Sequence, residues 1–133
     1  MRLSLVPPTN RKMPTSLMRK DINIAILKTL KTDYFLSEEF YKVGRGNNCD
    51  IKILDPTVSR EHFVLMRSRC GSHYIIVDWF PGSTRKSAGI IVDGNPVEVF
   101  ELKKHHTITL SSKVILYYQN IHVKTIDPEA TYT

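Results

Sequence analysis

The sequence has few cysteines and no long apolar stretch. Only Cys49 and Cys70 occur among 133 residues, too few for a disulfide framework, and their spacing matches no metal-binding pattern. No apolar run approaches the roughly 18 residues of a membrane-spanning helix. These absences favour an intracellular protein in a reducing compartment, without a membrane partner, a metal or another cofactor. The length suits one domain with its own core.

Acidic residues are missing from the first 20 positions, which carry five basic residues. The rest of the chain has 14 basic and 13 acidic residues, so most of the net charge of +6 lies in this leader. A folded domain of such balanced charge is a poor nucleic-acid binder, and only the leader keeps that possibility open. We expect a flexible basic leader at 1–20, a folded domain at 21–125 and a flexible tail at 126–133.

A long amphipathic helical pattern is also lacking. Short runs rich in β-branched and aromatic residues alternate with turn signals, among which Asp93-Gly94 is a strong hairpin signal. This pattern predicts an all-β protein, a two-sheet β-sandwich of about ten to eleven short, mostly antiparallel strands. The strands are expected at 22–26, 39–43, 49–54, 62–67, 73–80, 89–92, 96–100, 107–110 and 113–119, with 121–123 extending the last one.

Two polar motifs stand out between residues 41 and 65. Gly44-Arg45 follows one apolar run, and Ser59-Arg60-Glu61-His62 precedes another. A β-scaffold presents polar side chains from its loops in this way. The planar, permanently charged guanidinium group suits a pair of phosphate oxygens. Two arginines and a serine at one loop rim therefore predict a small site for a dianion.

In their order and spacing, Val43 to Arg45, Cys49 to Ile53 and Ser59 to His62 resemble the forkhead-associated (FHA) domain. This family has a phosphothreonine-binding β-sandwich of the FHA/SMAD-like type, and the resemblance runs from about Ile22 to Gln119. It implies a non-catalytic signalling module that binds a threonine-phosphorylated protein or peptide. It also implies an intracellular location, the nucleus in preference to the cytoplasm, and leaves self-association open.

The resemblance assigns the phosphopeptide contacts to five residues. Arg45 matches the phosphate-gripping arginine, and Ser59 matches the serine whose hydroxyl and backbone N–H meet the phosphate. Arg60 matches a position that reaches phosphate or peptide backbone, and Ser87 can supply a second hydroxyl. Thr84 belongs to the same loop and is a further candidate. Structural support of the binding loops is expected from Gly44, His62 and Gly89.

One position departs from the family pattern. Ala88 stands where the family has an asparagine that grips the peptide backbone, and alanine has no side-chain donor or acceptor. The alternative is therefore an FHA-like scaffold or dimerisation domain with a degenerate phosphate pocket. An enzyme is not expected, because the i, i+3 spacing of Ser59 and His62 does not direct the hydroxyl at the imidazole and no orienting carboxylate is evident.

Overall fold

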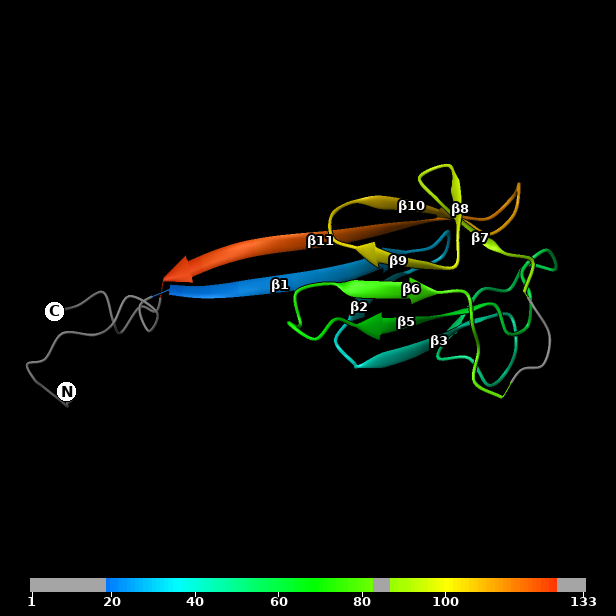
Figure 1. The fold of residues 1–133 in the computed structure, drawn as a ribbon, viewed down its shortest axis with the longest axis horizontal. Coiled ribbons are helices and arrows are strands. Elements are labelled where there is room, and N and C mark those ends of the chain that lie inside the picture. The colour runs from blue at the N-terminus through cyan, green and yellow to red at the C-terminus, as the bar shows by residue number, and fades with distance from the viewer. Residues whose placement is uncertain (1–18, 83–86, 127–133) are drawn as a thin grey trace, which may run out of the picture. The chain divides into compact units, whose positions relative to one another are not determined.

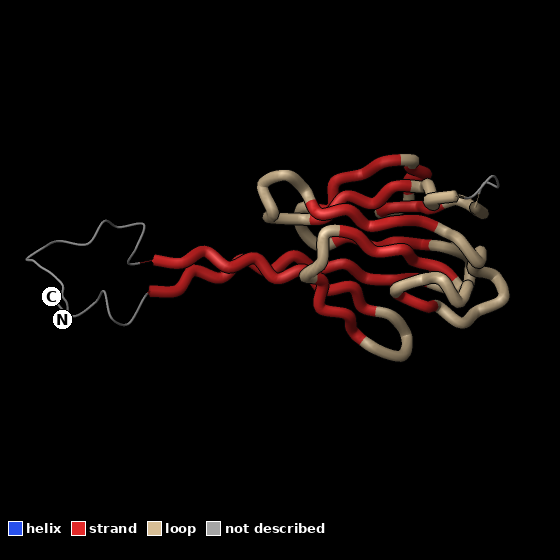
Figure 2. The backbone as a smooth tube through the Cα atoms, turned by 90° about the horizontal axis from the view of Figure 1, so that it is seen from below, coloured by secondary structure: helices blue, strands red, loops and turns tan. Residues whose placement is uncertain are grey.

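The computed structural model describes residues 19–82 and 87–126, and these residues form eleven strands and no helix (Figures 1 and 2). By its contacts the chain divides into two compact units, one of residues 23–121 and one of residues 1–22 and 122–133. The strands are β1 (Arg19–Lys28), β2 (Asp33–Leu36), β3 (Phe40–Gly44), β4 (Ile51–Lys52), β5 (Phe63–Arg67), β6 (Tyr74–Val77), β7 (Ile90–Val92), β8 (Asn95–Val97), β9 (Val99–Leu102), β10 (His106–Thr109) and β11 (Ile115–Ile126).

The strands form two sheets. One has the order β2-β1-β11-β10-β7-β8 and the other the order β4-β3-β5-β6-β9. Among the strand pairs whose register is described, only β3 and β4 run parallel, and the others are antiparallel. The prediction of an all-β, two-sheet sandwich of about ten to eleven mostly antiparallel strands is confirmed, with eleven strands in the described residues.

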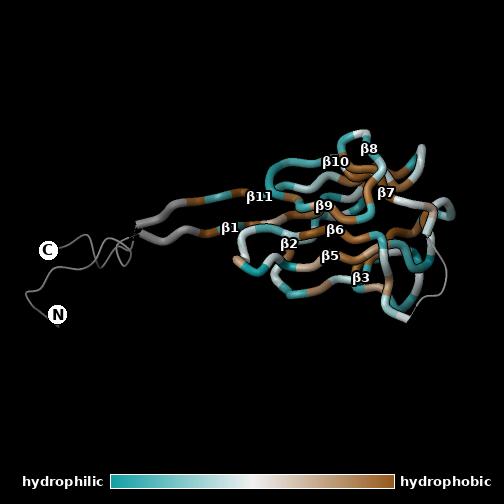
Figure 3. Tube along the Cα trace, in the orientation of Figure 1, coloured by the Kyte–Doolittle hydropathy of each residue, from teal (hydrophilic) through white to brown (hydrophobic). Residues whose placement is uncertain are grey.

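The core lies between the sheets because apolar residues alternate along each strand. In the five-stranded sheet, Tyr41 pairs with Leu65, and Leu65 pairs with Ile76, and all three pack into the main hydrophobic cluster. From the six-stranded sheet, Leu27 and Tyr118 enter the same cluster with no exposed surface. The strands are the most hydrophobic parts of the chain and the turns are mostly hydrophilic (Figure 3).

The Asp93-Gly94 hairpin is confirmed by its backbone geometry. Asp93 has a φ of 51° and Gly94 a φ of 87°, as the two central residues of a type I′ turn require. The Asp93 carboxylate accepts a hydrogen bond from the Thr107 backbone N–H at 2.9 Å and lies 2.7 Å from His106 Nδ1. These bonds tie the turn between β7 and β8 to the start of β10.

Three parts of the strand prediction are wrong. The predicted strand at 96–100 is two strands, β8 and β9, which belong to different sheets. Val97, Glu98 and Val99 alternate in polarity as one strand would, so periodicity does not reveal the change of sheet, after which Val99 is exposed and Phe100 packs on the core. The predicted strand at 73–80 ends at Val77, and Trp79 lies beyond it with 53% of its surface exposed. The short strand β2 was not expected at all.

The two cysteines have opposite surroundings. Both are free thiols, but Cys49 is buried and Cys70 is exposed in the turn between β5 and β6. Cys70 Sγ lies 3.4 Å from Ser68 Oγ and 2.9 Å from Ser72 Oγ. These hydroxyl groups lower the pKa of Cys70 to about 6, because they stabilise the thiolate, whereas burial raises the pKa of Cys49.

We therefore expect iodoacetamide to alkylate Cys70 with a rate that rises through a midpoint near its pKa of about 6. Cys49 should stay unmodified in the native protein, because it is buried. Intact-mass spectrometry at a series of pH values measures both rates. Ser72→Ala should raise the midpoint, because it removes the hydroxyl group that lies 2.9 Å from the sulfur. A midpoint near the ordinary cysteine value of about 8.5 would contradict this account.

Candidate functional site

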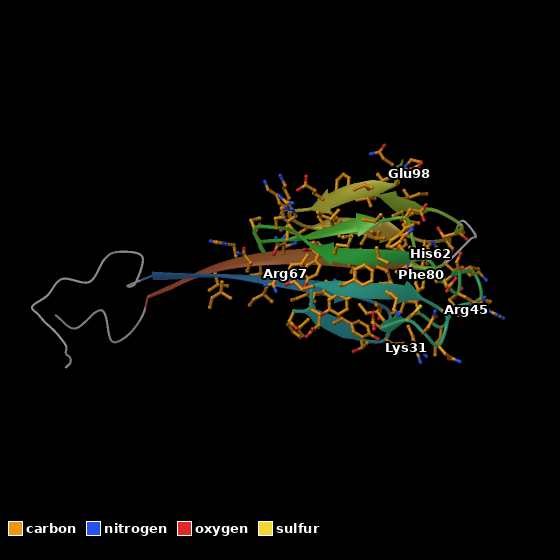
Figure 4. All side chains as sticks on the ribbon, turned by 60° about the horizontal axis from the view of Figure 1, so that its bottom comes forward. Lys31, Arg45, His62, Arg67, Phe80 and Glu98 are labelled. Atoms are coloured by element: carbon orange, nitrogen blue, oxygen red, sulfur yellow. The ribbon has the colours of Figure 1, made fainter. Side chains whose placement is uncertain are left out.

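Three segments meet at one end of the sandwich. The Arg45 backbone N–H donates a hydrogen bond to the Ser59 carbonyl oxygen at 3.0 Å, and the Ala88 backbone N–H donates one to Ser59 Oγ at 3.1 Å. Ser59 thus joins all three segments, and Figure 4 shows the labelled side chains of Arg45 and His62 at this end. The segments are residues 45–50 after β3, residues 53–62 between β4 and β5, and residues 87–89 before β7.

Gly44 lies where the end of β3 passes close to the loop between β4 and β5. A Cβ atom on Gly44 would lie 2.4 Å from the carbonyl oxygen of Arg60 and 3.0 Å from the backbone nitrogen of His62. Both neighbours are backbone atoms, so neither can move aside without displacing the chain. A residue without Cβ is needed at this close approach. Gly44 therefore sets the distance between the two loops that carry the arginines.

A hydrogen bond within the protein holds the side chain of Arg45 in place. Its Nε–H donates a hydrogen bond to the Val58 carbonyl oxygen at 3.0 Å, which fixes the guanidinium group beside the peptide that leads into Ser59. Among the described residues, none accepts a hydrogen bond from Nη1 or Nη2 of Arg45. The side chain is only partly buried. The arrangement therefore presents two terminal donor groups, already oriented, to an anion.

His62 is an internal brace between two of the segments. The ring is 1% exposed, and its Nδ1 accepts a hydrogen bond from the Ser59 backbone N–H at 3.0 Å. The opposite ring nitrogen, Nε2, lies 2.8 Å from the Gly89 carbonyl oxygen. Because Nδ1 accepts, the proton is on Nε2 and the ring is neutral. Burial lowers the pKa of His62, and the bond to Gly89 opposes this shift.

The lowered pKa of His62 predicts a loss of stability in mild acid. In the unfolded chain the pKa of this group is about 6.5, whereas in the folded protein burial lowers it and the ring resists protonation. The free energy of unfolding should therefore fall as the pH drops below about 6.5, and its decline should end below the folded-state pKa. Urea unfolding of the wild type and of His62→Gln at several pH values measures the difference in slope. The exposed His105→Gln is the control, and an equal change of slope in both variants would contradict the prediction.

The resemblance assigns two groups of Ser59 to phosphate, the hydroxyl and the backbone N–H, and only the hydroxyl is available. Its backbone N–H is already bound to His62 Nδ1, so this donor is not free for a ligand. Its Oγ accepts the Ala88 backbone N–H, and the hydroxyl hydrogen is left to donate. Ala88 thus contributes to the site through its backbone, where the family uses an asparagine side chain.

Ser87 is bound to a neighbouring carboxylate. Its Oγ–H donates to Asp78 Oδ1 at 2.6 Å, and the same oxygen accepts the Gly89 backbone N–H at 3.0 Å. The hydroxyl therefore shapes the segment before β7. Gly89 has a φ of 100°, which glycine adopts without strain, and this turn directs its carbonyl oxygen to His62.

The remaining predicted site residues are Arg60 and Thr84. The Arg60 side chain is exposed on the loop between β4 and β5, and its carbonyl oxygen accepts the Gly46 backbone N–H at 3.0 Å. The thiol of Cys49 donates to the same oxygen at 3.2 Å. Thr84 lies outside the described residues.

A second, small hydrophobic cluster supports the loops from behind, and sequence reasoning missed it. It consists of the buried side chains of Cys49, Val64 and Phe80, with Phe40 and Val77 packed against it. Val64 points away from the main core, so the loops after β3 and β6 fold back over the outer face of the sheet to cover it. The signal in the sequence is an aromatic residue, Phe80, placed directly before the Pro81-Gly82 turn.

The fold and the loops define a β-sandwich whose loops at one end bring Arg45, Ser59 and the 87–89 segment together. The family model for the FHA domain matches residues 41–111. The chain belongs to the FHA domain family. No sequence among curated proteins matches it. Among the described residues, no helix is long and apolar enough to cross a membrane, and no group of His, Cys, Asp and Glu side chains could hold a metal ion.

Solved structures agree with this assignment. The Slr1951 protein from Synechocystis sp. is 27% identical, with 75% of this chain and 98% of that protein covered and a TM-score of 0.67. A structure from a study of phosphothreonine-dependent FHA domain interactions is 22% identical, with 72% and 95% covered and a TM-score of 0.59. Mycobacterium tuberculosis EmbR, in complex with a low-affinity phosphopeptide, is 23% identical, with 72% of this chain and 24% of EmbR covered and a TM-score of 0.58.

Proposed function

We propose that this chain is a phosphothreonine-recognition module that binds a threonine-phosphorylated segment of another protein in signalling. The observation that carries the proposal is the fixed guanidinium group of Arg45. Its Nε–H is bound to the Val58 carbonyl oxygen at 3.0 Å, so the terminal nitrogens are oriented before a ligand arrives. A phosphate dianion accepts paired, charge-assisted hydrogen bonds from such a group. FHA domains are interaction modules, so we propose recognition without catalysis.

The neighbouring groups complete the proposed grip. The hydroxyl hydrogen of Ser59 donates to a second phosphate oxygen while its oxygen keeps the Ala88 N–H. Arg60, exposed on the same loop, reaches the phosphate or the peptide backbone. Ser87 mainly supports the loop, because its hydroxyl group donates a hydrogen bond to the Asp78 carboxylate. It can donate to a phosphate oxygen only if this hydrogen bond breaks. Thr84 stays a candidate for the same loop.

The proposed location is the inside of a cell. Cys49 and Cys70 are unpaired in the structure, as thiols are in a reducing compartment. A threonine-phosphorylated partner would meet the module in the nucleus or the cytoplasm, and microscopy of the tagged protein distinguishes the two.

Fluorescence anisotropy with a degenerate peptide library tests the proposal. Each peptide pool is prepared with phosphothreonine, phosphoserine and unmodified threonine at the fixed position. We expect binding of the phosphothreonine pool, weaker binding of the phosphoserine pool and none of the unmodified pool. Equal binding of phosphorylated and unmodified pools, or no binding of any pool at about 1 mM protein, would overturn the proposal and favour a degenerate pocket.

A further inference from the structure

Asp78 places a carboxylate beside the candidate anion site. It directly follows β6, and its backbone N–H donates a hydrogen bond to the Glu98 carbonyl oxygen at 2.7 Å. Its Oδ1 accepts the hydroxyl hydrogen of Ser87 at 2.6 Å, and the residue is partly buried. Within the part of the chain that the structure describes, no basic side chain forms an ion pair with this carboxylate. A negative group is therefore bonded into a site that we propose for a dianion.

A short series of hydrogen bonds joins Asp78 to Ser59. Ser87 Oγ accepts the Gly89 backbone N–H at 3.0 Å while its hydrogen is donated to Asp78. The next residue in the chain, Ala88, donates its backbone N–H to Ser59 Oγ at 3.1 Å. Because Ser87 and Ala88 are adjacent, the Asp78 carboxylate lies within about 10 Å of the Ser59 hydroxyl group. This is about one Debye length at physiological ionic strength, so the charge of Asp78 acts on an anion bound there.

The surroundings of His62 indicate that the charge of Asp78 reaches the interior of the loops. Burial lowers the pKa of His62, and both the Gly89 hydrogen bond and the negative charge of Asp78 oppose this shift. The same ring accepts the Ser59 backbone N–H. Charges in partly buried sites are screened much less by salt than charges in bulk water. A carboxylate that acts on the buried ring therefore also acts on a ligand of the loops that the ring supports.

The Asp78 carboxylate opposes a bound phosphate group in two ways. It repels a dianion through space, because both groups are negative. It also accepts the only hydrogen that the Ser87 hydroxyl group can donate, so carboxylate and phosphate compete for this donor. In the absence of phosphate the same hydrogen bond is useful, because it orients the Ser87 oxygen that accepts the Gly89 backbone N–H. One carboxylate thus stabilises the empty site and disfavours the occupied one.

We propose that Asp78 is an internal competitor of the phosphate group and limits the affinity of the site for phosphothreonine peptides. This inference rests on the proposed phosphopeptide function and adds a residue that regulates the same site. The phosphate would be bound mainly by Arg45 and Ser59, while Asp78 retains the Ser87 hydroxyl group. Removing the charge but keeping the acceptor should therefore strengthen binding. A residue that only positions Ser87 would give no such gain.

Asp78→Asn separates charge from shape, because the amide has nearly the same size and keeps an oxygen that accepts from Ser87. Fluorescence anisotropy measures binding of a peptide pool in which uncharged residues surround a phosphothreonine. At about 0.05 M salt we expect the variant to bind at least about threefold more tightly than the wild type. The gain should shrink at about 0.5 M salt, where the Debye length is about 4 Å.

Two further variants control the measurement. Glu38→Gln also removes one negative charge, but the exposed Glu38 precedes β3 whereas Arg45 follows it, so this variant should bind like the wild type. Ser87→Ala should change the affinity of the wild type less than about twofold, and it should remove part of the gain in Asp78→Asn, as a double-mutant cycle measures. Circular dichroism verifies folding, and Asp78→Ser, which keeps a hydroxyl acceptor, replaces Asp78→Asn if that variant does not fold.

The outcomes distinguish this inference from the proposed function. If the wild type binds the phosphorylated pool and Asp78→Asn binds it equally or more weakly, Asp78 only positions the loop and the inference is overturned, while the phosphopeptide function stands. A gain that Glu38→Gln shares, or that is unchanged at high salt, would also overturn it. Binding by Asp78→Asn alone would support the inference. If neither protein binds the pool at about 1 mM, the proposed function and the inference are both overturned.

Discussion

Arg45→Ala is expected to weaken binding of a phosphothreonine peptide at least about 100-fold, because each hydrogen bond to a charged group contributes about 1.5–3 kcal/mol and two are lost. The loss should appear mainly in affinity. Among the described residues, the side chain makes one hydrogen bond, from Nε to the Val58 carbonyl oxygen, so the free energy of unfolding should fall by only about 0.5–1.5 kcal/mol. Isothermal titration calorimetry with the best peptide from the library measures the affinity, and thermal unfolding measures the stability.

Two variants separate geometry from charge. Arg45→Lys keeps the charge but loses the planar fork, so its affinity should lie between those of the wild type and Arg45→Ala. Arg69→Ala removes the same charge from the exposed turn between β5 and β6, and it should bind like the wild type. If Arg45→Ala and Arg69→Ala lost the same amount of peptide affinity, Arg45 would contribute only general electrostatic attraction.

Gly44→Ala is expected to lower the free energy of unfolding by about 2–3 kcal/mol, because the new methyl group meets backbone that cannot rotate away. The contact is 2.4 Å to the Arg60 carbonyl oxygen. For a domain of this size the loss corresponds to a Tm lower by about 7–14 °C. Peptide binding should weaken as well, since the loop that carries Ser59 and Arg60 must shift to make room.

Gly46→Ala is the matched comparison. Its nearest contacts would be 3.0 Å, to the Arg60 carbonyl oxygen and to the Asn48 side chain, and the second of these can rotate. We therefore expect a smaller loss of stability from Gly46→Ala than from Gly44→Ala. Differential scanning calorimetry compares both with the wild type. A Gly44→Ala protein as stable as Gly46→Ala would mean that the loops adapt without cost.

Much of the fold was predictable because the signals were local. The alternation of apolar residues identified most strands, and Asp93-Gly94 specified its own turn. The division at Glu98 was not predictable, because Val97, Glu98 and Val99 alternate in polarity as one strand would, although Val99 is exposed and Phe100 is the next residue that packs on the core. The short strand β2 had the same difficulty, since four residues carry too little periodicity to be distinguished from a turn.

The residues of the candidate site were predictable from motif order, but their bonding was not. The sequence indicated that Arg45, Ser59 and His62 belong together. It could not show that the Ser59 backbone N–H donates a hydrogen bond to His62, or that the Ser87 hydroxyl group donates one to Asp78. These bonds join residues from different loops, and their geometry depends on the packed sandwich. The cluster around Phe80 was missed because Val64, although apolar, points away from the main core.

Ala88 should affect the lifetime of a peptide complex as well as its affinity. Association with a peptide is set mainly by diffusion and changes little among related sites, so a missing hydrogen bond appears as faster dissociation. In the proposed module, one absent bond of about 0.5–1.5 kcal/mol would shorten the residence time of a bound phosphothreonine peptide several-fold. A phosphatase would gain access to the phosphothreonine each time the peptide dissociates. The module would then report the current state of phosphorylation and release its partner soon after the signal ends.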